Sequence, residues 1–204
     1  MSEELQILAA PGEAELVIRR SRFTSMVQAC TVPAEAAAQL EAIRRSHPKA
    51  THHVSAWRLR DRQSATVRVH CDDDGEPGGT AGRPTLQVLE THGLVDALLV
   101  TVRYFGGIKL GAGGLVRAYA TAAREAVQAA RLVPLVPSHE LWIGVDFDLL
   151  TVIEHFCGRE GIPIHERRYT PRPEIRVTVA VADRERVERA LVDATGGRVT
   201  ITQV

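Results

Sequence analysis

A glycine-rich stretch from Arg103 to Tyr119, RYFGGIKLGAGGLVRAY, separates an aliphatic run from a long alanine-rich pattern. Glycine weakens regular structure and is used where the backbone bends left-handed or approaches another group closely. A strand, a cationic loop and a helix N-terminus in this order can hold an anion, because free N–H groups and the helix dipole both favour negative charge. The stretch therefore predicts a β–loop–α unit that contacts phosphate or nucleic acid. The alternative is that the glycines serve tight packing alone.

The glycine spacing matches neither common nucleotide-binding fingerprint. A Walker loop requires G-x-x-x-x-G-K-[ST], whereas Ala112 and Gly113 follow Gly111 here. The dinucleotide pattern G-x-G-x-x-G begins at Gly111 and Gly113 but has Val116 in place of its third glycine. These differences argue against ATP or NAD bound by those motifs, and we expect no cofactor.

Cations and aromatic residues accompany the glycines. Cationic side chains contact phosphates, and aromatic rings offer stacking faces for unpaired bases unless they belong to the core. The candidate residues for binding phosphate or nucleic acid are Arg83, Arg103, Tyr104, Phe105, Gly106, Gly107, Lys109, Gly111, Gly113, Gly114 and Arg117.

A second polar loop, DDDGEPGGTAGRP, is too rich in glycine and proline for a helix or a strand. Its carboxylates can either hold Mg²⁺ or Ca²⁺ or make turns and helix caps, and the EF-hand spacing is absent. A histidine upstream is a candidate base, but no serine or cysteine is placed as a nucleophile, so we expect no catalytic residue. The residues expected to shape a groove or bind metal are Asp72, Asp73, Asp74, Glu76 and His52.

The charge and cysteine content limit the class of protein. The 204 residues carry a formal net charge of zero, so any basic surface must be local. Cys30, Cys71 and Cys157 form no C-x-x-C pair, which suits buried thiols in a reducing compartment. No run reaches the roughly 18 apolar residues of a membrane span, and the N-terminus lacks a signal-peptide pattern. We expect a cytoplasmic protein with no membrane partner.

Hydrophobic periodicity predicts an α+β first domain over residues 1–135. The continuous apolar run before the glycine-rich stretch predicts a strand that is buried on both faces. The expected elements are two strands within 14–31 with a turn near Ser21, a helix at 34–45, strands at 51–59 and 65–71 joined by a turn at 60–63, a helix within 80–92, a strand at 94–104 and a helix at about 113–132.

Residues 132–138, LVPLVPS, contain two prolines and no helical period, which predicts a boundary and a second domain over residues 136–204. The second pattern is β-α-β twice, the ferredoxin-like arrangement. It contains no catalytic motif, so we expect a recognition or scaffold domain. Its expected elements are strands at 139–145, 163–169, 174–182 and 198–203 and helices at 148–159 and 184–194.

Four motifs together resemble those of a known family: SRF at Ser21–Phe23, HPKATHH at His47–His53, DDDGEPGGTAGRP and RYFGGIKLGAGGLVRAY. In this order they resemble the IMPACT family, of the bacterial YigZ type, over essentially the whole first domain. The second domain is similar to the small C-terminal domain of bacterial members. The sequence departs from the pattern at Gly79, where a serine or other small residue is common, and at His53, where asparagine is frequent. The His53 change weakens any mechanism that needs an amide at this position.

The resemblance implies a first domain of the ribosomal-protein β-α-β type shared with domain IV of elongation factor G. It implies a ferredoxin-like second domain similar to domain V of that factor. Eukaryotic relatives act in translational control, and bacterial members have no settled biochemical activity. The family motifs map onto Asp73, Gly75, Glu76, Pro77, Gly82, Arg83 and Pro84, and onto Arg103, Tyr104, Phe105, Gly106, Gly107, Lys109, Gly111, Gly113, Gly114 and Arg117.

We therefore expect a protein that binds RNA or the ribosome and influences translation without chemistry of its own. In this hypothesis Arg103, Lys109 and Arg117 supply charge to phosphate, and the acidic loop orients Arg83 by ion pairing. One alternative is an enzyme acting on a phosphorylated small molecule, with metal on the acidic loop and His52 as base. Another is a protein-interaction module that binds a protein partner through the second domain. The sequence leaves the oligomeric state open.

Overall fold

The computed structural model describes residues 5–61 and 66–204. It divides into two compact units, Met1–Leu135 and Val136–Val204. Part of the turn expected at 60–63 lies outside the described residues. Both units combine helices with antiparallel sheets, which confirms the α+β fold class.

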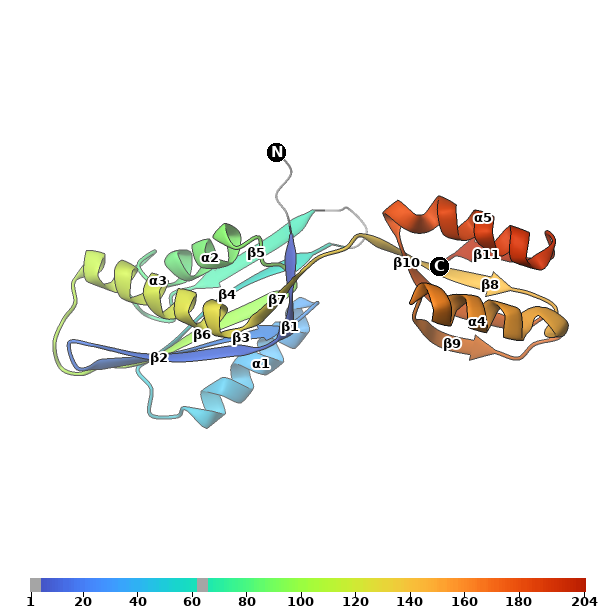
Figure 1. The fold of residues 1–204 in the computed structure, drawn as a ribbon. Helices are drawn as coiled ribbons and strands as arrows, with labels where there is room; N and C mark the ends of the chain where they lie inside the picture. Colours follow the sequence, from blue (N-terminus) through green and yellow to red (C-terminus); the bar gives the residue numbers. More distant parts are fainter. Residues whose placement is uncertain (1–4, 62–65) are drawn as a thin grey trace. The chain divides into compact units, whose positions relative to one another are not determined.

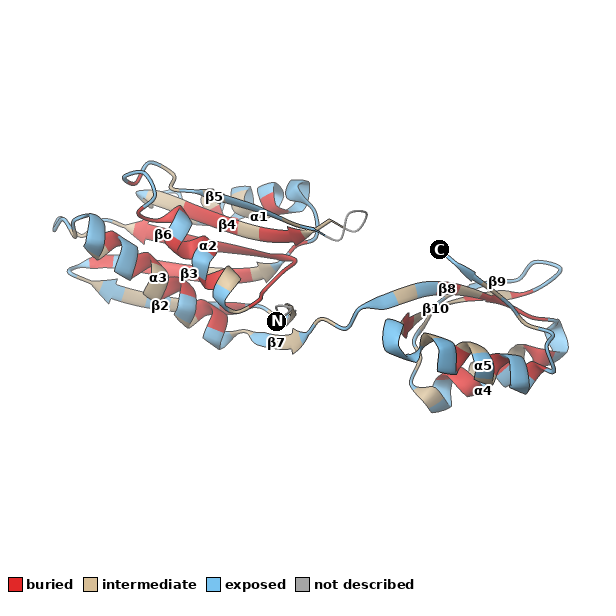
Figure 2. Cartoon of the chain, turned by 90° about the horizontal axis from the view of Figure 1, so that it is seen from above, coloured by how far each residue is buried: buried red, intermediate tan, exposed pale blue. Residues whose placement is uncertain are grey.

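The first unit contains a five-stranded antiparallel sheet in the order β2-β3-β6-β4-β5. Its central strand is buried along nearly its whole length, as the continuous apolar run predicts, and Figure 2 shows the burial continuing into both neighbouring strands. The strands are β2 (Gly12–Ile18), β3 (Ser21–Ala29), β4 (His52–Arg60), β5 (Val67–Asp72) and β6 (Ala97–Tyr104).

Helices cover both faces of this sheet (Figure 1). Successive side chains of a strand point to opposite faces, so β6 contributes to two cores. On one face, α1 (Pro33–Ser46) packs in a cluster that includes Val100. On the other face, α2 (Gly82–Thr91) and α3 (Ala112–Ala129) pack in a cluster that includes Leu99. The expected helices are confirmed, with α3 ending earlier than the apolar pattern suggested.

A two-stranded sheet joins the start of the first unit to its end. β1 (Gln6–Ala10) pairs antiparallel with β7 (Arg131–Pro134). The first residues of the expected boundary segment 132–138 thus belong to a strand, and the two units divide after Leu135, within that segment. Leu8 and Leu132 fix the two strands to the first unit, because they pack against the core beneath α2 and α3. Pro134 is tolerated there, since it stands at the end of an edge strand.

The second unit has the strand order β11-β8-β10-β9, with the apolar sides of its helices packed on one face of the sheet. This arrangement confirms the ferredoxin-like prediction. The elements are β8 (Ser138–Gly144), α4 (Leu150–Glu160), β9 (Ile164–Arg168), β10 (Glu174–Ala180), α5 (Arg184–Thr195) and β11 (Thr200–Gln203).

No helix in the described ranges of either unit is long and apolar enough to cross a membrane.

Candidate functional site

The strand register of the first unit brings both candidate loops to one end of the sheet. Arg22 at the start of β3 lies opposite Tyr104 at the end of β6, and His52 at the start of β4 lies opposite Arg103. The loop before α3 and the β2–β3 turn consequently lie at the same end, on the left in Figure 1. The acidic loop follows β5 at this end too, since Asp72 is paired with β4.

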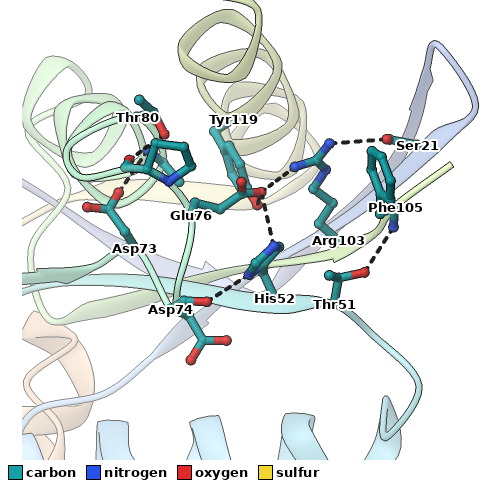
Figure 3. A network of polar contacts seen from close by, with 12 residues as sticks. Ser21, Thr51, His52, Asp73, Asp74, Glu76, Thr80, Arg103, Phe105 and Tyr119 are labelled. Atoms are coloured by element: carbon teal, nitrogen blue, oxygen red, sulfur yellow. Dashed lines mark hydrogen bonds and ion pairs between the residues drawn. The ribbon is translucent and has the colours of Figure 1, made fainter. Parts of the chain in front are cut away.

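A buried network joins the acidic loop to β6 (Figure 3). Oε1 of Glu76 accepts hydrogen bonds of 2.6 Å from the Arg103 guanidinium and 2.7 Å from the Tyr119 hydroxyl. The other terminal nitrogen of Arg103 donates to Oγ of Ser21 at 3.3 Å. The side chains of the ion pair are only 5% and 4% exposed. The acidic loop is therefore fixed to β6 by matched charges and to α3 by a hydrogen bond inside the unit.

This burial changes the role that the sequence suggested for Arg103. We expected its guanidinium to contact phosphate, but Glu76 already matches its charge and the side chain is buried. Its Cζ atom lies 5.4 Å from the ring centroids of both Phe23 and Phe105. Arg103 therefore positions the end of β6 and the start of the glycine-rich loop.

Tyr119 belongs to the same network, although it was not among the candidate site residues. Burial, reinforced by the Glu76 carboxylate, raises the pKa of Tyr119 above its ordinary value. The hydroxyl group stays protonated and donates to Glu76. Its ring packs edge-to-face on Phe23 with centroids 5.3 Å apart, so the residue serves the core and the network together.

Asp73 binds the backbone at the start of α2. Its Oδ1 accepts from the N–H groups of Ala81 at 2.9 Å and Gly82 at 2.7 Å, and its Oδ2 accepts from Gly79 at 2.7 Å. Burial opposes ionisation of the carboxyl, but the three backbone donors outweigh it and hold the pKa of Asp73 below its ordinary value. This is the turn-and-cap chemistry given above as the alternative to metal binding.

The remaining aspartates are also engaged in local contacts. Asp74 forms a 2.8 Å ion pair with Arg44, and its second carboxylate oxygen accepts from the N–H of His53 at 2.6 Å. Asp72 accepts from the N–H of Asp74 at 2.8 Å, as in an Asx turn. Within residues 5–61 and 66–204, no three His, Cys, Asp or Glu side chains are grouped to hold a metal ion.

His52 faces the network from β4. Its Nδ1 lies 2.8 Å from the carbonyl oxygen of Asp74, which can only accept, so Nδ1 donates, and in the neutral imidazole Nε2 keeps the lone pair. That Nε2 lies 3.9 Å from Oε1 of Glu76. Two acceptors at this separation form no hydrogen bond when the histidine is neutral, and the His52 side chain is 18% exposed.

Arg83 pairs with a residue of its own helix and not, as the hypothesis required, with the acidic loop. Its guanidinium donates to Glu90 at 3.2 Å along α2, and the side chain is exposed. The acidic loop does not orient it, because the carboxylates of that loop bind backbone groups, Arg44 and Arg103 instead.

Three glycines of the loop before α3 are required by sterics. A Cβ at Gly106 would overlap the backbone of Arg20, and Gly107 and Gly111 take φ values of +84° and +71°. L-residues disfavour such angles, so packing and turn geometry account for these glycines. Gly113 and Gly114 lie in the first turn of α3, where the N–H groups have no intrahelical acceptor. Sterics therefore account for the three glycines of the loop, whereas anion contact at Gly113 and Gly114 stays a prediction.

Two exposed cations accompany this loop. Lys109 precedes α3, and Arg117 extends back so that its Nη1 lies 3.7 Å from where a Cβ of Gly113 would be. In the described part of the chain, neither cation has a carboxylate partner. Their charges are therefore available to an anion.

The two aromatic residues that follow Arg103 differ in availability. Tyr104 lies beneath the guanidinium of Arg22, with Cζ 4.4 Å from its ring centroid, and its hydroxyl is 2.8 Å from Nδ1 of His47. Phe105 is 46% exposed, and its N–H donates to Oγ1 of Thr51 at 3.1 Å. Phe105 is consequently the more exposed of the two rings.

Sequence reasoning missed two further cations at this end. Arg19 and Arg20 form the turn between β2 and β3 and are exposed. The periodicity placed them at the end of a strand. The available signal was a pair of arginines at a two-residue turn, where glycine or asparagine is usual.

A model of the Impact N-terminal domain matches residues 19–127. The chain belongs to the IMPACT family. A domain of unknown function matches residues 143–198. The chain is 32% identical to the IMPACT family member YigZ of Escherichia coli over 99% of its own length and 98% of that protein. It is 32% identical to the IMPACT family member YvyE of Bacillus subtilis over 94% of its length and 87% of that protein.

A solved structure described only as a hypothetical protein has the same fold. Its TM-score is 0.70 at 32% identity, and the match covers 100% of this chain and 98% of that one. The IMPACT domain match begins at Arg19 and contains both loops, the β2–β3 turn and α3 as far as Val127. Every candidate site residue named above lies in the IMPACT domain.

Proposed function

We propose that this IMPACT family member binds RNA, free or within the ribosome, through the cationic end of its first unit, and thereby influences translation without chemistry of its own. The observation that carries the proposal is the unpaired charge of Lys109 and Arg117 beside the first turn of α3. The chain has as many acidic as basic residues, so a general excess of positive charge does not explain why these cations lack acidic partners. The expected role of the family in translation supports the same choice.

The surface combines two features used in binding nucleic acid. Cations neutralise phosphates without reading sequence, and exposed aromatic rings stack with unpaired bases. Lys109 and Arg117 supply the first feature, and the exposed ring of Phe105 supplies the second. The buried Arg103–Glu76 pair has a positioning role, because it fixes the strand end from which Phe105 projects.

Binding should be measured by ribosome co-sedimentation and by RNA affinity across a salt series. Lys109→Ala with Arg117→Ala should lower affinity about tenfold or more and reduce the slope of log affinity against log salt by about two. Arg103 is left intact, because its replacement would test the fold as well.

The matched control is Arg45→Ala with Arg189→Ala, which removes the same charge from exposed positions outside the proposed surface. This control should bind RNA like the wild type. If both double variants lost the same RNA affinity, the loss would come from the change in net charge and not from the proposed surface. An unchanged salt slope in Lys109→Ala with Arg117→Ala would refute the proposal.

An enzyme acting on a phosphorylated small molecule is the second candidate, and His52 is the observation that favours it. In the neutral imidazole its Nε2 carries a lone pair, and the side chain is 18% exposed beside the network. Two open surface pockets of about 380 and 480 Å³ lie away from His52, against α5 and at the start of α1. Thermal stabilisation by Mg²⁺ together with a sugar phosphate, lost in His52→Ala, would favour this candidate over RNA binding.

A protein partner of the second unit stays a prediction. Exposed large apolar side chains of that unit, such as Phe147, Tyr169 and Val204, belong to separate segments of the chain.

A further inference from the structure

We infer that the β2–β3 turn is a second phosphate-contacting segment, so that the surface holds a strand with several neighbouring phosphates instead of a single phosphate group. The inference rests on the proposed function, which it deepens by naming the ligand class. Three observations on Arg19 and Arg20 support the inference: their backbone angles, the lack of partners for their side chains, and the packing of their turn.

The backbone of the turn is unfavourable for the residues that occupy it. Ile18 pairs with Ser21, which leaves a two-residue connection whose φ values are +44° at Arg19 and +68° at Arg20. Connections with two positive φ angles normally carry Asn-Gly or Asp-Gly, because other L-residues are disfavoured there. Such outliers concentrate where a protein uses the residues for binding or catalysis.

Interactions within the protein do not explain the two arginines. Both side chains are exposed, and neither has a carboxylate partner in residues 5–61 or 66–204. The neighbouring Arg22 does have partners within the protein. Its Nε lies 3.9 Å from Oε2 of Glu15, and its guanidinium lies over the ring of Tyr104. Two disfavoured residues with free charges are better explained by a ligand than by folding.

Close packing fixes the turn to the glycine-rich loop. Only a residue without Cβ can stand at position 106, because its backbone contacts that of Arg20 directly. Oγ of Ser21 joins the same segments, since it accepts from the N–H of Gly106 at 3.2 Å and from Arg103 at 3.3 Å. The turn is thus held against the loop that contains Lys109.

The charge of the combined surface indicates the ligand. Arg19, Arg20, Lys109 and Arg117 come from the turn, the loop and α3 and have no acidic partners among the described residues. A phosphate monoester carries at most two negative charges and can engage only part of this set. A strand of RNA presents one charge per nucleotide along an extended backbone, which suits cations spread over several segments.

The decisive variant is Arg19→Asn with Arg20→Gly, because it removes both charges and supplies the residues that the turn prefers. We expect a melting temperature equal to or above that of the wild type, since the backbone strain is relieved. We expect the affinity for poly-uridine RNA to fall about tenfold and the salt slope to fall by about two. Arg19→Lys with Arg20→Lys keeps the charges and should keep most of the affinity and slope.

Uridine monophosphate provides the single-phosphate probe for the same proteins. Any affinity for it should be equal in the wild type and the Asn-Gly variant, whereas poly-uridine should distinguish them. Wild-type affinity of the Asn-Gly variant for poly-uridine would overturn the inference, and so would a lowered melting temperature, which would give the arginines a folding role. If Lys109→Ala with Arg117→Ala still lost affinity for RNA in those cases, the proposed RNA-binding function would be supported and only the role of the turn would be refuted.

Discussion

The Glu76 carboxylate and the Arg103 guanidinium form a buried ion pair across a gap of 2.6 Å, with Glu76 in the acidic loop and Arg103 at the end of β6. Tyr119 of α3 donates to the same carboxylate oxygen. Three segments of the first unit therefore meet at one oxygen atom. The surface that we propose for RNA begins next to this junction, because the exposed Phe105 lies two residues after Arg103 in the chain.

The first prediction concerns the stability of this junction. Arg103→Ala should lower the free energy of unfolding by about 3–5 kcal/mol, because it leaves the Glu76 charge buried and uncompensated. Urea denaturation measures the loss. Arg83→Ala is the control, since Arg83 pairs with Glu90 at the surface, and it should change the same quantity by about 0.5 kcal/mol or less.

Replacing both partners separates the pair from its surroundings. Glu76→Leu with Arg103→Met should recover a large part of the loss, because apolar residues of similar volume often substitute for a buried pair. A double variant as unstable as Arg103→Ala would contradict this account and would assign the stability to the bonds with Tyr119 and Ser21.

The local patterns in the sequence were sufficient for the main elements of both units. The apolar run at 97–102 indicated a buried strand, and the spacing of alanines and aliphatic residues indicated α3. β7 was missed because it is short and pairs with β1 from the other end of the unit. Its stability comes from that distant pairing and from core contacts, which local periodicity does not record.

The sequence motifs brought out residues of both loops at this end of the sheet, but not the contacts that those residues make. The motifs singled out Arg103 and Glu76, yet their direct pairing depends on how the acidic loop folds over the end of β6. Burial then turned a presumed phosphate ligand into a positioning residue. Arg19 and Arg20 were overlooked because a turn with two positive φ angles is unfavourable for arginine, so propensity pointed away from them.

The second prediction is a pH-dependent contribution from Asp73. Its pKa is lowered in the folded protein, so its stabilising effect is present above the unfolded value, near 3.9, and disappears as the pH falls through the lower folded value. Asp73→Asn should therefore cost about 1–2 kcal/mol in free energy of unfolding at neutral pH, because the bonds to the α2 N-terminus lose their charge.

Urea unfolding of both proteins at pH 7 and near pH 3 tests this prediction. The difference between wild type and Asp73→Asn should shrink at the lower pH, because the Asp73 carboxyl of the unfolded chain is already largely protonated there while the folded protein still resists protonation. A difference that is constant with pH would show that the carboxylate charge does not stabilise the start of α2.

The third prediction concerns the contact between Gly106 and the β2–β3 turn. Gly106→Ala should lower the free energy of unfolding by about 1–3 kcal/mol, because its Cβ would overlap the backbone of Arg20 and force the segments apart. Gly78→Ala is the matched control, since a Cβ at Gly78 has open space and the residue does not take a positive φ. Thermal and urea unfolding should leave the control close to the wild type; equal losses in both variants would argue against a specific contact.

The fourth prediction separates stacking from charge at the proposed RNA surface. Phe105 is 46% exposed, so Phe105→Ala should change the melting temperature little. If the ring stacks with an unpaired base, the variant should lose about 1–3 kcal/mol of binding free energy for poly-uridine RNA while the salt slope stays unchanged. Phe105→Trp keeps an aromatic face and should retain binding, with its indole fluorescence reporting contact with the base. Val17→Ala, at another exposed apolar position, serves as control. A variant Phe105→Ala that bound single-stranded RNA as tightly as the wild type would leave phosphate contact as the whole of the interaction.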